Sequence, residues 1–244
     1  MIPRPAPDVV KDTAGICARG LRSILEAGFA SSWYEYELAD TDGSALLLGR
    51  HTAQLELMTH ARTVAVVRAN LIEVFADVDG WFGRPVDERA FRPVSQGWTI
   101  DQVLEHVSLT NHFLMLTLRK AVEKAVRLAA LGRPIPAGDS DLQRLEAIGQ
   151  RGSFPWLRPE HMDPSGRTTP DEVRAILQQQ REECLALLER LNHGEGALCQ
   201  LRMSVNALGR IDLYQWLYFL AQHARRHLQQ MASIEEEFKS VSPV

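Results

Sequence analysis

The sequence predicts an all-α protein, a four-helix bundle preceded by an N-terminal extension. Four long stretches repeat apolar residues every three or four positions, which is the spacing of a helix that buries one face. Gly and Pro stand near the ends of these stretches, where helices stop. The 244 residues are 45% hydrophobic and 24% charged, a composition that can fill one sizeable core. We expect the bundle to span residues 51–240 and the extension residues 1–50.

The extension carries the weakest pattern. Residues 8–27 fit a helix, although two glycines lower its helix propensity. Residues 33–48 fit either a short β-hairpin or two irregular segments around the turn Asp-Thr-Asp-Gly. The first long helix is predicted from Thr52 to about Val78, and Gly80 follows its end.

The second and third long helices have clear start signals. Thr99 is a suitable N-cap for the second helix. The sequence Thr169-Pro-Asp-Glu starts the third helix, with Thr169 as the cap and proline at the first helical position, and this helix ends near His193. The long connection between them holds a short helix near residues 140–148. A connection of this length favours an end-to-end crossover over a tight antiparallel turn.

The last helix, residues 211–238, carries two histidines on its apolar stripe. His223 and His227 occupy positions where leucine is usual, and side chains four residues apart lie one above the other on a helix. This spacing alone arises often by chance. The position of the pair on the buried face supports a functional role more strongly than the spacing alone does, because buried imidazoles need a hydrogen-bond partner or a ligand. A third histidine, His106, lies on the corresponding stripe of the second helix.

Three histidines from two helices suggest a metal site. They would supply three neutral nitrogen ligands at about 2.0–2.1 Å and leave a position for water or substrate, which is the ligand number of a catalytic site. No Glu-x-x-His motif occurs, which argues against a di-iron bundle. The same residues also fit polar core groups bonded to tyrosine or backbone. His60 could also face inward, whereas four other histidines are expected in solvent: His51, His112, His161 and His193.

Charge and cysteine content argue against several classes of function. The net charge is −4 and Lys and Arg form no dense block, so nucleic-acid binding is not expected. No apolar run reaches the length of a membrane span, and the N-terminus does not have the form of a signal peptide. Cys17, Cys184 and Cys199 are odd in number and include no Cys-x-x-Cys pair. We therefore expect a cytoplasmic protein with structurally inert thiols.

Several motifs together resemble the DinB-like superfamily, which includes damage-inducible proteins and YfiT-type thiol transferases. These motifs are Trp98-Thr ahead of His106 at a helix start, His223-x3-His227-x2-Gln230 on the last helix, the stretch 209–221 before that pair, and the Pro-rich approach to Thr169-Pro-Asp-Glu-Val. The resemblance covers residues 52–238.

The resemblance implies an up-down-down-up bundle, often homodimeric, in which His106, His223 and His227 hold a divalent metal ion. Nickel or zinc is expected first, with iron or manganese as alternatives. The implied function is metal-dependent thiol transfer, or hydrolysis, with a small-molecule substrate that includes a low-molecular-weight thiol. Family members often carry Asp where this chain has Ala224. The alternative is a non-catalytic, stress-associated metal-binding or dimeric assembly protein.

Two residues are expected in a substrate pocket. Gln230 lies one helical turn after His227 and could touch a bound ligand, with a surface amide as the alternative. Trp156 could cover the site or simply fill the connection between the second and third helices. The pattern assigns no side chain to catalysis beyond the metal ligands.

Overall fold

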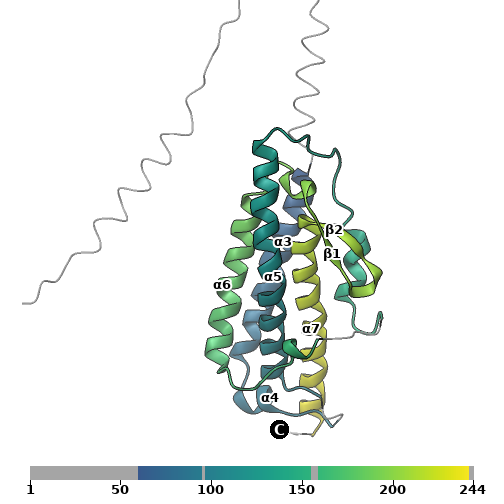
Figure 1. Ribbon diagram of the computed structural model, residues 1–244. Helices are drawn as coiled ribbons and strands as arrows, with labels where there is room; N and C mark the ends of the chain where they lie inside the picture. Colours follow the sequence, from purple (N-terminus) through teal and green to yellow (C-terminus); the bar gives the residue numbers. More distant parts are fainter. Residues whose placement is uncertain (1–59, 95–96, 155–158, 242–244) are drawn as a thin grey trace, which may run out of the picture. The chain divides into compact units, whose positions relative to one another are not determined.

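The computed structural model describes residues 60–94, 97–154 and 159–241 (Figure 1). This part of the chain is mostly helical and contains one small two-stranded sheet. Its long helices are α3 Ala61–Gly80, α5 Ile100–Ala130, α6 Pro170–Glu189 and α7 Leu213–Val241. Several sequence predictions fall outside the described residues: the helix at 8–27, the segment 33–48, the helical start at Thr52, and the side chains of Cys17, His51 and Trp156.

The predicted starts of α5 and α6 are confirmed by their caps. The Thr99 hydroxyl accepts from the Gln102 backbone N–H at 3.2 Å, and the Gln102 side chain accepts from the Thr99 N–H at 3.1 Å. Thr169 and Glu172 form the same reciprocal pair at the start of α6, where Pro170 takes the first helical position. Each box satisfies two N–H groups that a helix start leaves open.

Shorter elements connect the long helices. Helix α4, Val86–Ala90, lies in the segment between α3 and α5. The short helix expected near residues 140–148 is a 3₁₀ turn, Gln143–Gly149. Further 3₁₀ turns are Trp81–Gly83, Glu160–Met162, Glu195–Leu198 and Val205–Ala207.

Helix α3 packs against α6 and α7, and α5 packs against the same two helices. Arg174 near the start of α6 pairs with Asp79 near the end of α3 at 2.7 Å. Arg68 near the start of α3 donates to Glu189 at the end of α6 at 2.6 Å. The ion pairs thus occur in opposite order along these two helices.

The contacts of α5 differ between its two neighbours. Along α6 the ion pairs occur in the same order on both helices: Arg119 with Glu183 at 2.5 Å, then Glu123 with Arg190 at 2.7 Å. Against α7, the Trp216 indole N–H donates to the Leu114 carbonyl at 3.3 Å.

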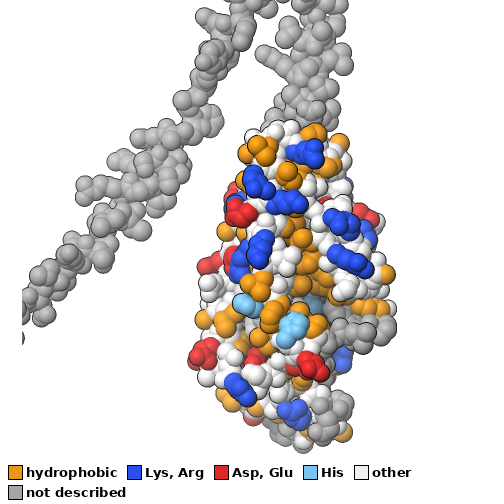
Figure 2. Space-filling view, in the orientation of Figure 1, with side chains coloured by type: hydrophobic (Ala, Val, Ile, Leu, Met, Phe, Trp, Pro, Cys, Tyr) orange, Lys and Arg blue, Asp and Glu red, His pale blue; other side chains and the backbone are white. Residues whose placement is uncertain are grey.

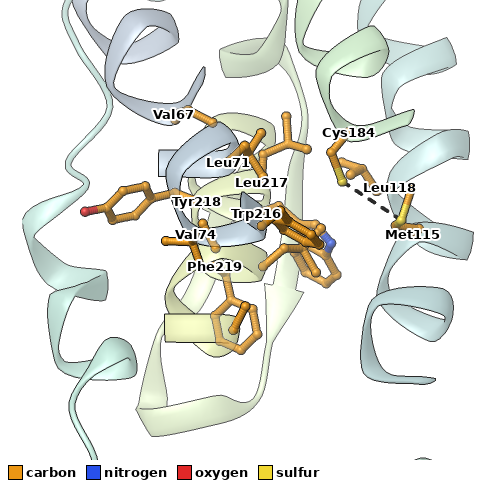
Figure 3. Packing of buried hydrophobic residues seen from close by; sticks show 14 of the residues in the cluster. Val67, Leu71, Val74, Met115, Leu118, Cys184, Trp216, Leu217, Tyr218 and Phe219 are labelled. Carbon is orange, nitrogen blue, oxygen red and sulfur yellow. Dashed lines mark hydrogen bonds between the residues drawn. The ribbon is translucent and has the colours of Figure 1, made fainter. Parts of the chain in front are cut away.

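The core lies between the long helices, each of which contributes the apolar stripe that the sequence predicts. Figure 3 shows Val67, Leu71 and Val74 of α3 beside the α7 side chains from Trp216 to Phe219. On the other side, Met115 and Leu118 of α5 lie next to Cys184 of α6. Burial of these stripes supplies the main driving force for the fold.

A β-hairpin before α7 corrects the purely helical prediction. Strands β1, Gln200–Met203, and β2, Gly209–Asp212, pair antiparallel from Gln200 opposite Asp212 to Met203 opposite Gly209. Each strand has four residues, too few to display an alternating pattern that could be separated from irregular chain. At the end of β2, Asp212 and Gln215 exchange hydrogen bonds, which start α7 two residues later than predicted.

The surface and the helices add two further observations. Figure 2 shows one face of the molecule, where Lys and Arg side chains lie mostly over the upper half of the described part, among apolar, uncharged and acidic surface. In the described part of the chain, every helix is too short or too polar to cross a bilayer.

Candidate metal centre

The structure brings three histidines together between α5 and α7. His106 lies in the second turn of α5, and His223 and His227 lie on consecutive turns of α7. Their side chains are 5%, 2% and 7% exposed, and one nitrogen of each lies within 4.8 Å of the others. The Nε2 atoms of His223 and His227 are 3.1 Å apart. The helix period places the α7 pair one above the other, and packing of α5 against α7 adds the third ring.

Hydrogen bonds orient two of the three rings. The Nδ1 atom of His106 lies 2.7 Å from the Met162 carbonyl oxygen, and Nδ1 of His227 lies 2.9 Å from Oε1 of Gln230. Both oxygens can only accept, so Nδ1–H is the donor in each case. Nε2 of each ring therefore keeps its lone pair for a ligand bond, and the partner fixes the ring orientation.

The His223 and His227 rings are neutral at physiological pH. Burial, and secondly the charges of His227 and His106, hold the pKa of His223 well below its ordinary value. Burial, with a smaller effect of His106, lowers the pKa of His227 to about 3, and the hydrogen bond to Gln230 partly opposes this shift. The positive charges of Arg226 and Arg151 lower the pKa of His227 further. Neutral imidazole is the form that binds metal.

The geometry of the His223–His227 pair fits a divalent ion. With metal–nitrogen bonds of about 2.0–2.1 Å, two ligands at tetrahedral or right angles lie about 2.8–3.4 Å apart. The 3.1 Å between the Nε2 atoms of His223 and His227 falls in that range. Three imidazoles suit zinc, nickel or iron and leave coordination positions for a further ligand.

Glu105 anchors a loop beside the cluster, and sequence reasoning did not assign it this role. Its side chain is buried and accepts from the Ser165 hydroxyl at 2.7 Å, the Ser165 N–H at 3.1 Å and the Gly166 N–H at 2.8 Å. The neighbouring His106 binds the Met162 carbonyl. Two adjacent residues of α5 thus hold the segment from Met162 to Gly166. The sequence feature that could have indicated this role is the position of the Glu105 carboxylate between two residues of the apolar stripe.

A small pocket of about 110 Å³ lies near the cluster, although none of the three histidines lines it. Trp98 and Gln230 connect the two features, because the Trp98 ring lies 4.8 Å from the His106 ring and Gln230 is bonded to His227. Arg151 also lines the pocket, together with Pro93, Gly97, Ser233, Ile234 and Glu237. Gln230 lines this pocket, but its contact with a substrate stays a prediction, and Trp156 lies outside the described residues.

The other described histidines are not part of the cluster. His112, His161 and His193 are exposed, in agreement with the sequence analysis. His60 faces inward, where its Nε2 lies 3.0 Å from the Pro136 carbonyl oxygen and its ring stacks on Tyr214. This histidine is therefore a buried residue of the core.

The described cysteines are free and buried, as expected for inert thiols. The Cys184 Sγ lies 4.0 Å from the Met115 sulfur (Figure 3), and burial raises the pKa of this thiol to about 12. Cys199 is 6% exposed. Ala224 is fully buried on α7, and its methyl group offers no proton acceptor there.

A family model described as the DinB superfamily matches residues 63–231. The matched range begins in α3, ends in α7 and contains all three clustered histidines. The comparisons with curated proteins and with solved structures gave no match.

Proposed function

The chain belongs to the DinB superfamily, and from this premise we propose that it is a metal-dependent enzyme that transfers a low-molecular-weight thiol to an electrophilic small molecule. One observation carries the proposal: three buried histidines, two of them with strongly lowered pKa values, converge near a small pocket. That combination offers both a ligand set with an open position and space for a substrate near it.

His106, His223 and His227 would hold the ion, with zinc or nickel as the first candidates. When bound, the ion would lower the pKa of a coordinated thiol or water and so provide a nucleophile at neutral pH. The Met162 carbonyl and Gln230 fix the orientation of two of the rings. Burial keeps water from the remaining faces of the rings, which strengthens electrostatic interactions within the site.

The chain's own cysteines do not serve as the nucleophile. Cys184 is fully buried between helices, and its raised pKa keeps it a thiol at neutral pH. The sulfur therefore comes from an external thiol. In the transfer, a sulfur–carbon bond to the acceptor forms as the bond to its leaving group breaks. The thiol proton passes to solvent, since Ala224 has no carboxylate to receive it.

We also propose that the four long helices form the up-down-down-up bundle of the family. The ion pairs between α3 and α6 occur in opposite order along the two helices, which supports antiparallel packing. Those between α5 and α6 occur in the same order, which supports parallel packing. A long crossover between α5 and α6 is consistent with that direction.

A second function is favoured by a different observation. The exposed fractions of the three histidines are only 2–7%, which suits a closed site that retains its ion without turnover. The protein would then be a metal-binding or assembly protein. The pocket beside Gln230 and Trp98 supports the catalytic proposal instead, because it gives a small ligand a place near the histidines.

The test compares the protein loaded with zinc or nickel and the same protein after complete chelation. Each is assayed with a panel of small thiols and electrophilic acceptors, and the conjugate is detected by mass spectrometry. We expect turnover with the loaded protein and none after chelation. Turnover that survives chelation contradicts the proposed mechanism, and full metal occupancy without turnover for any thiol supports the binding protein.

A further inference from the structure

The structure gathers basic side chains that lie far apart in the sequence. Figure 2 shows Lys and Arg side chains over the upper half of α5 and over the hairpin of β1 and β2, on one face of the molecule. Six exposed residues of these elements form what we call the basic face: Lys120, Lys124, Arg127, Arg133, Arg202 and Arg210. The net charge of −4 therefore coexists with a local excess of positive charge.

Helical spacing places three of the six cations in one row on α5. Lys120, Lys124 and Arg127 are related by steps of four and three residues, so the row lies on one side of the helix and is about 10 Å long. The other charged residues in this half of the helix, Arg119 and Glu123, form ion pairs with α6. The side of α5 toward α6 is thus neutralised by ion pairs, whereas the row keeps its positive charge.

The hairpin adds a pair of like charges. Arg202 of β1 lies directly opposite Arg210 of β2 in the strand register, so both exposed side chains project from the same side of the hairpin. Like charges in directly opposite positions destabilise a β-ribbon. The Arg210 Nη2 donates to the Gln200 carbonyl at 3.2 Å, which leaves most of its N–H donors for another partner. Two guanidinium groups that repel each other are stabilised when an anion binds between them.

No carboxylate of the described residues balances the basic face. None of its six cations forms an ion pair within residues 60–94, 97–154 and 159–241, whereas ion pairs join α3 to α6 and α5 to α6. Charge without a partner in the same molecule attracts an anionic partner over about 10 Å at 0.1 M salt. The basic face is therefore a docking surface for a partner that carries several negative charges.

An exposed leucine lies within the basic face and narrows the choice of partner. Leu131 ends α5, one helical turn after Arg127 and two residues before Arg133, and its side chain is 76% exposed. A large apolar side chain flanked by cations suits the boundary between lipid head groups and acyl chains. A single nucleic-acid strand would instead be held by aromatic side chains that stack on its bases, and the basic face contains none.

We propose that the basic face binds the surface of a membrane that contains anionic phospholipids, with Leu131 as its apolar anchor. Clusters of about four to eight Lys and Arg residues bind anionic leaflets, and each cation contributes about fivefold to the affinity. The lipid phosphates pair with the guanidinium and ammonium groups, and the leucine side chain leaves water for the head-group boundary. The histidine cluster takes no part in this contact, so the inference stands apart from the proposed function.

Sedimentation of the full-length protein with lipid vesicles tests the inference. One set of vesicles contains phosphatidylcholine alone, and the other contains phosphatidylcholine and the anionic lipid phosphatidylglycerol in a ratio of two to one. We expect binding to the anionic vesicles only, with an affinity that falls as the salt concentration is raised, because salt screens exposed charges. Equal binding to both sets of vesicles, or no binding to either, would overturn the proposal.

A double variant, Arg202→Gln with Arg210→Gln, tests the hairpin. Its affinity for the anionic vesicles should fall about tenfold or more. Its Tm should equal or exceed that of the wild-type protein, because the variant removes the repulsion between the strands. The matched control, Arg92→Gln with Arg167→Gln, removes two exposed arginines from outside the basic face and should bind the vesicles as the wild-type protein does. Unchanged vesicle binding in the hairpin variant, or a lowered Tm, would count against the proposal.

A second pair of variants tests the apolar anchor. Leu131→Ser should weaken binding to the anionic vesicles about fivefold or more, because the inserted apolar area is lost. Val94→Ser removes a side chain that is 79% exposed and lies ahead of the start of α5, and it should leave the affinity unchanged. A short single-stranded RNA is titrated in parallel. RNA that binds more tightly than the vesicles, through the same two hairpin arginines, would overturn the choice of partner.

Discussion

Replacing Glu105 by glutamine should loosen the loop that orients His106. The carboxylate accepts three hydrogen bonds of 2.7–3.1 Å from Ser165 and Gly166. Glutamine has nearly the same shape, but its NH₂ would face an N–H or O–H donor and could not accept. At least one charge-assisted bond is lost and the others become neutral, which costs about 3 kcal/mol of unfolding free energy.

Two measurements follow from that number. For a folded unit of this size, about 3 kcal/mol lowers Tm by roughly 6–12 °C. Zinc affinity should fall about tenfold, because the Met162 carbonyl that orients His106 lies on the released segment. Differential scanning calorimetry of metal-free protein gives the first value, and competition with a chromophoric chelator gives the second.

The control is Glu123→Gln, which breaks an exposed ion pair with Arg190. Exposed pairs contribute little to stability, so Tm and zinc affinity should both stay near their wild-type values. The reasoning is refuted if Glu105→Gln melts within a degree of wild type. A normal Tm drop with unchanged zinc affinity would show that the loop stabilises the fold without orienting His106.

The other predictions concern the histidines, the thiol and the core. His227→Ala should abolish stoichiometric zinc binding, whereas the exposed His112→Ala should retain it; elemental analysis that finds equal zinc in both would contradict the ligand assignment. In a Cys17→Ala, Cys199→Ala background, Cys184 should resist iodoacetamide at pH 8. Its pKa of about 12 leaves only about one thiol in ten thousand as the reactive thiolate at that pH. Rapid labelling of the folded protein, measured by mass spectrometry, would refute this. Gly196→Ala should lower the free energy of unfolding in urea by about 1–3 kcal/mol, because the new methyl carbon would lie 2.6 Å from the Tyr214 ring. As a control, Gly80→Ala meets no atom within 4 Å and should leave this free energy unchanged or slightly higher.

The sequence by itself determined the long helices and the starts of α5 and α6. Helical periodicity and the capping boxes at Thr99 and Thr169 involve residues within four positions of one another, so they can be read without the fold. The spacing of His223 and His227 is equally local, and it put both rings on one face of α7. Periodicity also placed His106 on the apolar stripe of its helix, but its grouping with the other two gained most of its weight from the family resemblance, since nothing in a single sequence fixes which helices are neighbours.

The tertiary structure decided everything that depends on how connections return to the bundle. Met162 meets His106 across 56 positions of sequence, and Ser165 meets Glu105 across 60. Arg151 reaches Ser233 across 82 positions. Such contacts leave no periodic trace, because each depends on one loop conformation and not on a repeated face. The hairpin before α7 was not predicted for a related reason. Its four-residue strands are stabilised by pairing with each other, and only the folded chain shows that pairing.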